Sequence, residues 1–437
     1  MRIAYLITGS GGSFYCGNCY RDMLYVRAIR KVPGISATAI PLYLPPDRKS
    51  TGNEFDRHVF FGAISLYLRE KVPIFSHLPD WFDRIFDNRL MLKMASHQAG
   101  TTRTEGLEDL TLNMIKGENT FRSHEVERLV GYMKKPAKPD IIHLSNALII
   151  GLAGQLKRRL DVRIICSILN EDDWIEEMAE PYRSKAWEMI ASESVHIDAF
   201  VTPSSYYRDF FIGKTGISGD KIDIVPIGFE GVSEPVKANV KTPSIGYLCR
   251  MNRMNGFDKM VDAFIILKSW RGMNDLSLHV SGGYTGDDRR FVREQMSKLE
   301  SAGFKDSVVI YHEFQEFDKQ EFFNNIDLLS VPVRKHDGYG IYLLEANAAG
   351  VPVVQPATGA FPEIIGRTGG GIVYEPDSVH TLAENMYKLL MDDTGRKKLG
   401  EKGRSGVLRE LSLPAMSAGL AEIYRKMTGN VTDKQTL

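Results

Sequence analysis

The feature that most constrains this chain is a repeated alternation of short β-branched runs with stretches of helical periodicity. Strands that alternate with helices in this way form βαβ units, whose strands run parallel in a sheet. The expected strands lie at residues 3–8, 140–144, 162–167, 199–203 and 221–225, and then at 244–249, 276–281, 307–311, 327–333, 351–355 and 371–374. The sequence therefore predicts the α/β class with parallel sheets.

The alternation lapses at residues 228–243, where GFEGVSEPVKANVKTP shows no hydrophobic periodicity. A segment rich in Gly, Pro and Lys without a period is typical of a linker. A chain of 437 residues is long enough for two large domains. We therefore expect two similar α/β domains, at 1–235 and 243–410, with a last helical segment at 411–430.

An aromatic-rich segment at about 42–135 interrupts the first domain and is interpreted as an insertion. Open parallel sheets bind ligands at the carboxyl ends of their strands, so an insertion there could line a substrate site, with Trp81 on the acceptor side. The alternative, that Trp81, Phe82 and Phe86 only cover the core, is equally open because aromatic side chains pack more often than they bind.

The composition excludes several classes of protein. The 55 basic and 55 acidic residues give a net charge of zero, so no overall field attracts nucleic acid or anionic lipid. Four cysteines in so long a chain favour a reducing compartment, and we expect a cytoplasmic protein. The N-terminal apolar run is too short for a secretory signal, and no run reaches the roughly 18 apolar residues of a membrane span.

The strongest local signal is SVPVRKHDGYGIYLLEANAAGVPVVQP at residues 330–356, which predicts a strand, a glycine-rich loop, a helix and a strand. Gly338 and Gly340 allow the backbone to approach a ligand closely. The amides of Gly340, Ile341 and Tyr342 would open the helix, where a phosphate binds well.

Two carboxylates belong to the same segment. Glu345 is the single acid of a helix that is apolar nearly all round, where an unpaired carboxylate would cost several kcal/mol. Helical side chains lean toward the N-terminus, so Glu345 should lean toward the loop that holds Asp337. The alternatives are that Asp337 is a helix cap and that Glu345 is a paired core acid.

Basic side chains follow the first strand of the second domain, in SIGYLCRMNRMNGFDKMVDAF. Arg250 stands at the carboxyl end of that strand, where its guanidinium can hold two phosphate oxygens, and Arg253 is within reach of the same opening. The alternative for Arg250 is a surface salt bridge.

Other signals are weaker. Gly9, Gly11 and Gly12 lack the G-x-G-x-x-G spacing, and no acid follows at the end of the second strand, so a nicotinamide cofactor is disfavoured. Cys16 and Cys19 form a single C-x-x-C pair that would leave zinc under-coordinated, so we assign them mainly to packing. Further polar residues lie at strand ends or helix starts. Asn170 and Glu171 belong to the acidic stretch NEDD after a predicted strand, which is either part of the cleft or a solvated loop, and Asp287 and Asp288 are expected to begin a helix.

Taken together, these positions resemble the family-4 glycosyltransferases, retaining enzymes with the GT-B fold. The E-x7-E pattern of the family falls on Asp337 and Glu345, its G-R-L…K-G stretch falls on CRMNRMNG from Cys249, and its A-A-G-V-P-V-V is present from Ala348. Weaker matches follow in the same order along the chain: PDIIH at Pro139, VTPSSYYRDFF at Val201, IVPIGFE at Ile224 and FPEII at Phe361.

The resemblance implies two Rossmann-like domains whose sheets face an interdomain cleft, and a last helix that packs back across the domain junction. It implies a nucleotide-sugar donor and a glycan or glycolipid acceptor, with no metal and no other cofactor. Family roles then carry over residue by residue: Glu345 to the ribose, Asp337 to the sugar, and Arg250, Gly340, Ile341, Tyr342, Gly11 and Gly12 to the diphosphate. Because some relatives work at membranes, a peripheral position at the inner face of the membrane is compatible with it.

Three departures from the family pattern bear on activity. The first acid is Asp337 rather than Glu, a change of one methylene. The expected lysine is Asn255, and losing a charged hydrogen bond to the diphosphate costs roughly 1.5–3 kcal/mol unless Arg253 compensates. The expected histidine is Leu169, so Asn170 or Glu171 would have to contact the sugar instead. The alternative to an active transferase is therefore a weak or inactive nucleotide-sugar-binding module.

Overall fold

The computed structural model describes residues 1–8, 17–42, 104, 106–117, 123–134, 138–229, 242–311 and 318–429. The chain divides into two compact units. Unit 1 comprises Met1–Gly11, Asn18–Pro226 and Met416–Leu437, and unit 2 comprises Gly12–Gly17 and Ile227–Ala415. Gly11, Gly12, Cys16, Trp81 and most of the expected insertion and linker lie outside the described residues.

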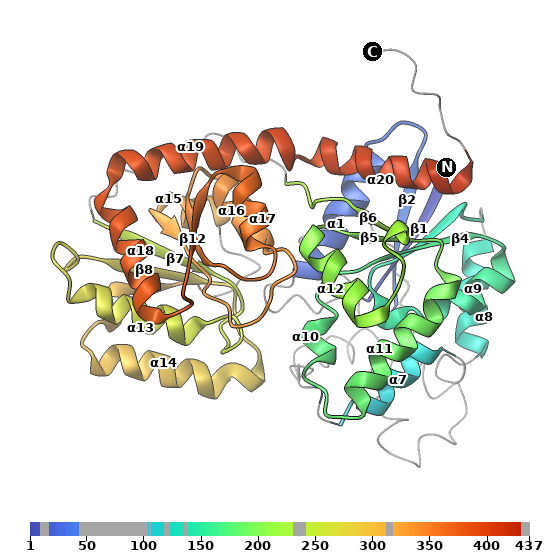
Figure 1. Cartoon of the computed structure of the whole chain (residues 1–437), viewed down its shortest axis with the longest axis horizontal. Coiled ribbons are helices and arrows are strands. Elements are labelled where there is room, and N and C mark those ends of the chain that lie inside the picture. The colour runs from blue at the N-terminus through green and yellow to red at the C-terminus, as the bar shows by residue number, and fades with distance from the viewer. Residues whose placement is uncertain are drawn as a thin grey trace. The chain divides into compact units, whose positions relative to one another are not determined.

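Unit 1 is built on a six-stranded sheet with the order β2-β1-β3-β4-β5-β6, in which every pairing is parallel. Its strands are β1 (Arg2–Ile7), β2 (Ser36–Pro41), β3 (Ile141–Leu144), β4 (Arg163–Ser167), β5 (Ala199–Thr202) and β6 (Ile222–Ile224). Its helices include α1 (Gly17–Arg30), α7 (Glu108–Lys116), α8 (Ser123–Lys134), α9 (Leu152–Leu160), α10 (Asp172–Ile175), α11 (Tyr182–Glu193), α12 (Ser205–Thr215) and α20 (Leu413–Thr428). Helices α1 and α20 lie on one face of the sheet, and α9, α11 and α12 lie on the other (Figure 1).

Unit 2 repeats this architecture with the order β12-β11-β10-β7-β8-β9, again fully parallel. Its strands are β7 (Ser244–Leu248), β8 (Ser277–Ser281), β9 (Val308–Ile310), β10 (Leu328–Leu329), β11 (Val353–Pro356) and β12 (Gly371–Tyr374). Its helices include α13 (Phe257–Lys268), α14 (Arg289–Ser301), α15 (Lys319–Asn324), α16 (Ile341–Ala348), α17 (Phe361–Thr368), α18 (Val379–Met391) and α19 (Asp393–Glu410). In Figure 1, α13 and α14 lie on one face of the sheet and α16, α17 and α19 on the other.

The predicted α/β class with parallel sheets is confirmed, and the expected strands are present within one or two residues at most ends. The exception is the strand expected at 327–333, because β10 contains only Leu328–Leu329. Beyond it the Val333 N–H donates to the Val331 carbonyl at 2.8 Å, so the backbone turns out of the ladder into the glycine-rich loop.

The strand order places a topological switch point in each sheet. In unit 2 the central strand β7 has β8 on one side and β10 on the other, and in unit 1 β1 lies between β2 and β3. Ligands of open α/β sheets bind outside the carboxyl ends of the strands at such points. The loops after β7 and β10 are therefore where unit 2 is built to bind a ligand.

Burial explains why these strands have continuous apolar sequences. All five residues of β7 and all four of β3 and of β11 are buried, as expected for strands covered by helices on both faces. Within the described part of the chain, no helix has the length and apolar character needed to cross a membrane.

Candidate active site

The loops that follow β7 and β10 are joined at the edge of the unit 2 sheet. Gly256, which precedes α13, has φ +71°, and a Cβ atom there would lie 1.9 Å from the carbonyl oxygen of Pro332. Only glycine permits this approach with this backbone conformation. Arg334 adds two bonds, from its N–H to the Met254 carbonyl at 2.8 Å and from Nη1 to the Arg253 carbonyl at 2.7 Å. The two predicted ligand loops thus form one structure.

Arg250 lies in this structure, two residues after β7, with 14% of its side chain exposed. Its Nε donates to Oδ2 of Asp288 at 2.7 Å, and its Nη2 donates to Oγ1 of Thr285 at 2.9 Å. Because a guanidinium carries five N–H donors, these bonds use two of them. Arg250, which the sequence predicts to bind phosphate, is therefore a largely buried cation. It is held by Asp288, a partner that the sequence did not indicate.

Asn255, at the expected lysine position, points into the loop and is 7% exposed. Its Nδ2 donates to the Arg250 carbonyl at 3.0 Å, and its own N–H donates to Oδ1 of Asn252 at 2.7 Å. Arg253, by contrast, is 76% exposed, with its Nε 3.9 Å from Asp258. The amide at position 255 therefore stabilises the backbone that carries Arg250.

Asp337 organises the glycine-rich loop. It is 6% exposed, and its Oδ1 accepts hydrogen bonds from the N–H groups of Tyr339 and Gly340, both at 3.1 Å. The hydroxyl of Tyr342 lies 3.5 Å from its Oδ2. The Gly340 amide that the sequence offers to a phosphate thus already donates to Asp337, and a ligand that uses this amide must replace that bond.

Glu345 is buried within α16, and its side chain is fully shielded from solvent. Its Oε1 forms an ion pair with Nζ of Lys319, the first residue of α15. In parallel βαβ units the N-terminus of each helix lies at the carboxyl edge of the sheet, so Lys319 reaches Glu345 from the site side. Glu345 is thus a paired buried acid, which is the alternative that the sequence analysis gave for this residue.

Helix α16 begins at Ile341, directly after Gly340, which has φ +73°. Gly340 is the N-cap residue and has no side chain, so it makes no side-chain cap hydrogen bond to the helix. The first N–H groups of a helix have no partner within the helix, and the helix dipole favours an anion there. This end of α16, next to Asp337 and at the edge that carries Arg250, is thus suited to a phosphate.

The acceptor-side candidates Asn170 and Glu171 belong to unit 1. Glu171 is 2% exposed, its Oε1 accepts from the Ala147 N–H at 3.0 Å and its Oε2 accepts from the Tyr207 hydroxyl at 2.6 Å. Burial raises the pKa of this carboxyl. Asn170 has φ +61°, and Leu169, at the expected histidine position, is 2% exposed. Glu171 therefore stabilises the segment after β4 by joining it to Ala147 and Tyr207.

A second polar cluster, absent from the sequence-based candidates, lies at the carboxyl edge of the unit 1 sheet. Arg21 is 1% exposed, its Nε lies 3.1 Å from Oδ1 of Asp22, and its Nη2 donates to the carbonyl of Ser145 after β3. The Tyr5 hydroxyl donates to the same Asp22 oxygen at 3.1 Å. Burial raises the pKa of Asp22 to about 6.

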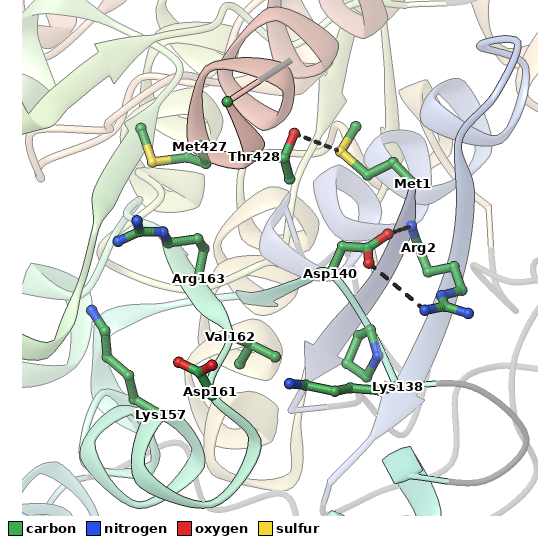
Figure 2. Close-up of a pocket in the computed structure, with 12 residues that line it drawn as sticks. Met1, Arg2, Lys138, Asp140, Lys157, Asp161, Val162, Arg163, Met427 and Thr428 are labelled. Carbon is green, nitrogen blue, oxygen red and sulfur yellow. Dashed lines mark hydrogen bonds and ion pairs between the residues drawn. The ribbon is translucent and has the colours of Figure 1, made fainter.

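A cavity of about 830 Å³ lies at the opposite, amino edge of the unit 1 sheet (Figure 2). Three of the cations that line it are paired with carboxylates. Arg2 lies 3.7 Å from Asp140, and Lys157 and Arg163 share Asp198 at 2.9 and 3.1 Å. This cavity is therefore remote from the carboxyl ends of its own sheet, where ligands of such folds bind.

The described residues contain no group of three or more His, Cys, Asp or Glu side chains that could hold a metal ion. Of the predicted site residues, Arg250, Arg253, Asn255, Asp337, Gly338, Gly340, Ile341, Tyr342 and Glu345 all belong to unit 2, around one edge of its sheet. The sequence did not identify Lys319, Thr285 and Asp288 as site residues, because the folding of the sheet brings them to Glu345 and Arg250 from distant parts of the sequence. The one related sequence feature was Asp287 and Asp288, which were expected only to begin a helix.

Two family models match the chain. The model described as "Glycosyl transferases group 1" matches residues 230–406, and the model described as "Glycosyltransferase Family 4" matches residues 113–230. Together they extend over both units and include every described candidate residue.

Two curated relatives show the same affiliation. The lipopolysaccharide core biosynthesis mannosyltransferase LpsB of Rhizobium meliloti is 28% identical over 190 residues, which is 42% of this chain and 51% of LpsB. A GDP-mannose-dependent phosphatidylinositol monomannoside mannosyltransferase of Corynebacterium glutamicum is 28% identical over 193 residues, 42% of this chain and 47% of that enzyme. The matches thus span about half the length of these relatives.

Solved structures resemble the whole chain. Sucrose-phosphate synthase from Thermosynechococcus elongatus superposes with a TM-score of 0.69 at 16% identity, over 98% of this chain and 99% of that one. HepE of Anabaena, solved with UDP and glucose, gives 0.70 at 13% identity over 98% and 100%. The predicted GT-B fold is confirmed. With the two family matches and the ordered motifs, this establishes that the chain belongs to the family-4 glycosyltransferases, glycosyl transferases group 1.

Proposed function

We propose that this protein transfers a hexosyl group from a nucleotide-diphosphate sugar to a sugar, polysaccharide or lipid-linked acceptor, with retention of anomeric configuration and without a metal. The observation that carries the proposal is the convergence of Arg250, Asp337, Glu345 and the start of α16 at the switch point of unit 2. The activities of the two mannosyltransferase relatives support a glycan or glycolipid acceptor.

The chemistry proposed for these residues is electrostatic. As the glycosidic bond to the donor breaks, negative charge develops on the leaving diphosphate, and preorganised cations and amides stabilise it. Arg250 and the first amides of α16 supply these groups. Asp288 and Thr285, which hold Arg250, are buried, so little reorganisation is needed when the charge develops.

The two acids have separate roles in the proposal. Glu345 accepts hydrogen bonds from the ribose hydroxyls, and Lys319 keeps its carboxylate paired when no ligand is bound. Asp337 holds the loop through the Tyr339 and Gly340 amides and stands next to the transferred sugar. The protein acts in the cytoplasm in this proposal, with any contact at the inner membrane face provided by a lipid-linked acceptor.

A specific observation favours a second candidate, a weak or inactive nucleotide-sugar-binding module. Asn255 directs its amide to the Arg250 carbonyl, so the cation that the family places at this position is replaced by an uncharged brace. Asn255→Lys distinguishes the candidates, with Asn255→Ala as the control that removes the brace without adding charge. A gain of about tenfold in turnover with lysine marks a weakened enzyme. No turnover in wild type or variant marks the module.

Thermal unfolding with UDP, GDP and their hexose conjugates, with and without magnesium, tests the proposed donor site. Ligand at a hundred times its dissociation constant adds about 2.7 kcal/mol to the native state. We expect one base to give a magnesium-independent shift that Glu345→Gln abolishes and that Glu384→Gln, an exposed acid on α18, leaves unchanged. No shift with any nucleotide would contradict the proposal, and the anomer of the product, determined by NMR, tests retention.

A further inference from the structure

We infer that Asp288, together with Thr285, is the positioning residue of the donor site, which fixes the plane of the Arg250 guanidinium for the diphosphate. This inference rests on the proposed function, since it assigns a role to residues around the proposed phosphate ligand. Neither residue belongs to a motif that carries the family resemblance.

The first observation is that one edge of the guanidinium is fully engaged by the turn after β8. Nε of Arg250 donates to Oδ2 of Asp288 at 2.7 Å, and Nη2 donates to Oγ1 of Thr285 at 2.9 Å. Nε and one N–H of Nη2 form the same edge of the planar group, so two bonds on that edge set its plane as well as its position. The remaining donors then have fixed directions.

The second observation is that the turn itself locks both acceptors. Thr285 and Asp288 form a capping box around the 3₁₀ turn Gly286–Asp288, in which the Thr285 N–H and hydroxyl donate to Oδ2 of Asp288 at 2.9 and 2.8 Å. Because the threonine proton is committed to Asp288, a lone pair of its oxygen is directed at Arg250. Both side chains are buried, at 5% and 8% exposure.

The third observation is that hydrogen bonds between the two backbone segments continue from the end of β8 into the loops. The Cys249 N–H donates to the Ser281 carbonyl at 3.1 Å, and the Met251 N–H donates to the Gly283 carbonyl at 2.8 Å. Arg250 lies between these bonds, so its main chain is fixed to the β8 side while its side chain is fixed to the turn that follows.

Positioning and simple charge neutralisation predict opposite effects when Asp288 becomes Asn. The amide keeps the volume and removes a negative charge from beside the cation, but its uncharged oxygen is a weaker acceptor for the three donors that Oδ2 holds, which are Nε of Arg250 and the N–H and hydroxyl of Thr285. If Asp288 only neutralised Arg250, a nucleoside diphosphate would bind more tightly and turnover would be unchanged. If Asp288 sets the geometry for the transition state, kcat falls while ground-state affinity changes little.

The experiment compares wild type, Asp288→Asn, Thr285→Val, Thr285→Ser and a control. The control, Glu294→Gln, removes one exposed carboxylate of α14, the helix that follows the turn; this carboxylate pairs with Arg290. UDP and GDP binding is measured by calorimetry, and steady-state turnover is measured with whichever nucleotide sugar the wild type uses. Melting curves identify any variant that does not fold.

We expect kcat to fall about 10- to 100-fold in Asp288→Asn and Thr285→Val, with diphosphate affinity within about threefold of wild type. Thr285→Ser should restore turnover, and Glu294→Gln should match wild type. If Asp288→Asn fails to fold, the comparison of Thr285→Val with Thr285→Ser tests the inference. Unchanged kcat in the folded variants, or tighter diphosphate binding with unchanged kcat, overturns the inference alone. A wild type that neither binds a diphosphate nor turns over overturns the proposed function and this inference with it.

Discussion

At the scale of single residues, His143 is a polar side chain in the core of unit 1. It lies on β3 with no exposed surface, its Nδ1 is 2.7 Å from the Tyr424 hydroxyl and its Nε2 is 2.8 Å from Oγ of Ser167. Burial, followed by the nearby charge of Arg21, lowers the pKa of His143 to about 3. The folded protein therefore holds this histidine neutral across the physiological range.

This neutral histidine predicts a loss of stability in acid. The unfolded histidine binds a proton near its ordinary pKa of about 6.5, so its contribution is fully present above that pH and is lost progressively as the pH falls toward 3, at up to about 1.4 kcal/mol per unit. The raised pKa of Asp22, about 6, acts in the opposite direction, because the folded state then takes up the proton first. Urea unfolding from pH 7 to pH 4 should show a shallower acid loss for His143→Gln than for wild type. The exposed His380→Gln is the control, and parallel curves for wild type and His143→Gln would contradict the prediction.

Which residues could be placed from the sequence depends on how local their contacts are. Asp337 and Glu345 were placed on one loop and helix because their spacing is a local property, and the structure finds both buried there. Their partners come from elsewhere: Lys319 is 26 residues from Glu345, and Asp288 is 38 residues from Arg250. Such pairs are created by the packing of neighbouring β-α units, which no local pattern records.

At the scale of elements, the loop between β7 and α13 depends on a close approach that only glycine allows. A Cβ atom on Gly256 would lie 1.9 Å from the Pro332 carbonyl oxygen, in addition to the cost of its positive φ. Gly303 has a similar φ of +79° with nothing within 4 Å of the equivalent Cβ position. Substitution of Gly303 therefore tests backbone strain alone, whereas substitution of Gly256 tests backbone strain together with a steric clash.

We expect Gly303→Ala to lose about 1 kcal/mol of unfolding free energy, from the left-handed backbone alone, and Gly256→Ala to lose at least about 2 kcal/mol more. Chemical denaturation of both variants measures the difference. Because the Pro332 side of this contact carries the ligand loop, Gly256→Ala should also weaken nucleoside diphosphate binding while Gly303→Ala does not. Equal losses of stability in the two variants would show that the loop can relax around the added methyl group.

The strands themselves were predictable because parallel strands covered on both faces need continuous apolar sequence, which stands out against polar loops. The end of β10 could not be predicted in this way. Residues 331–333, VPV, are apolar whether they pair in the sheet or turn away from it. The decisive factor is the site loop, whose bonds to Arg253 and Met254 hold the chain away from the sheet.

At the scale of the whole molecule, the chain leaves unit 1 at Pro226 for the main part of unit 2, Ile227–Ala415, and returns to unit 1 at Met416. Helix α20 then contributes Met416, Leu420 and Tyr424 to the unit 1 core, each at most 2% exposed. A buried apolar side chain of this size contributes about 1.5–3 kcal/mol. The last helix is therefore an integral part of the first unit.

A chain that ends at Ala415 should therefore lose stability in unit 1 and keep it in unit 2. Calorimetry should show the transition of unit 1 at a lower temperature or absent. The transition of unit 2 should remain and still shift with the nucleoside diphosphate that the full chain binds. A melting curve identical to that of the full chain would contradict the role of α20.

The return of the chain to unit 1 also determines the order in which the two units can be completed during synthesis. Apart from the short segment Gly12–Gly17, which is synthesised earlier, unit 2 is contiguous from Ile227 to Ala415, so it can fold as soon as that stretch leaves the ribosome. Unit 1 begins first but lacks α20 until the roughly 200 residues after Pro226 have also been synthesised, a delay of about 10 to 40 s at ordinary elongation rates. During that interval the face of β3 that carries His143 is not yet covered by Tyr424. Nascent unit 1 therefore exposes part of its core, and we expect it to be the part of the protein that most needs chaperones.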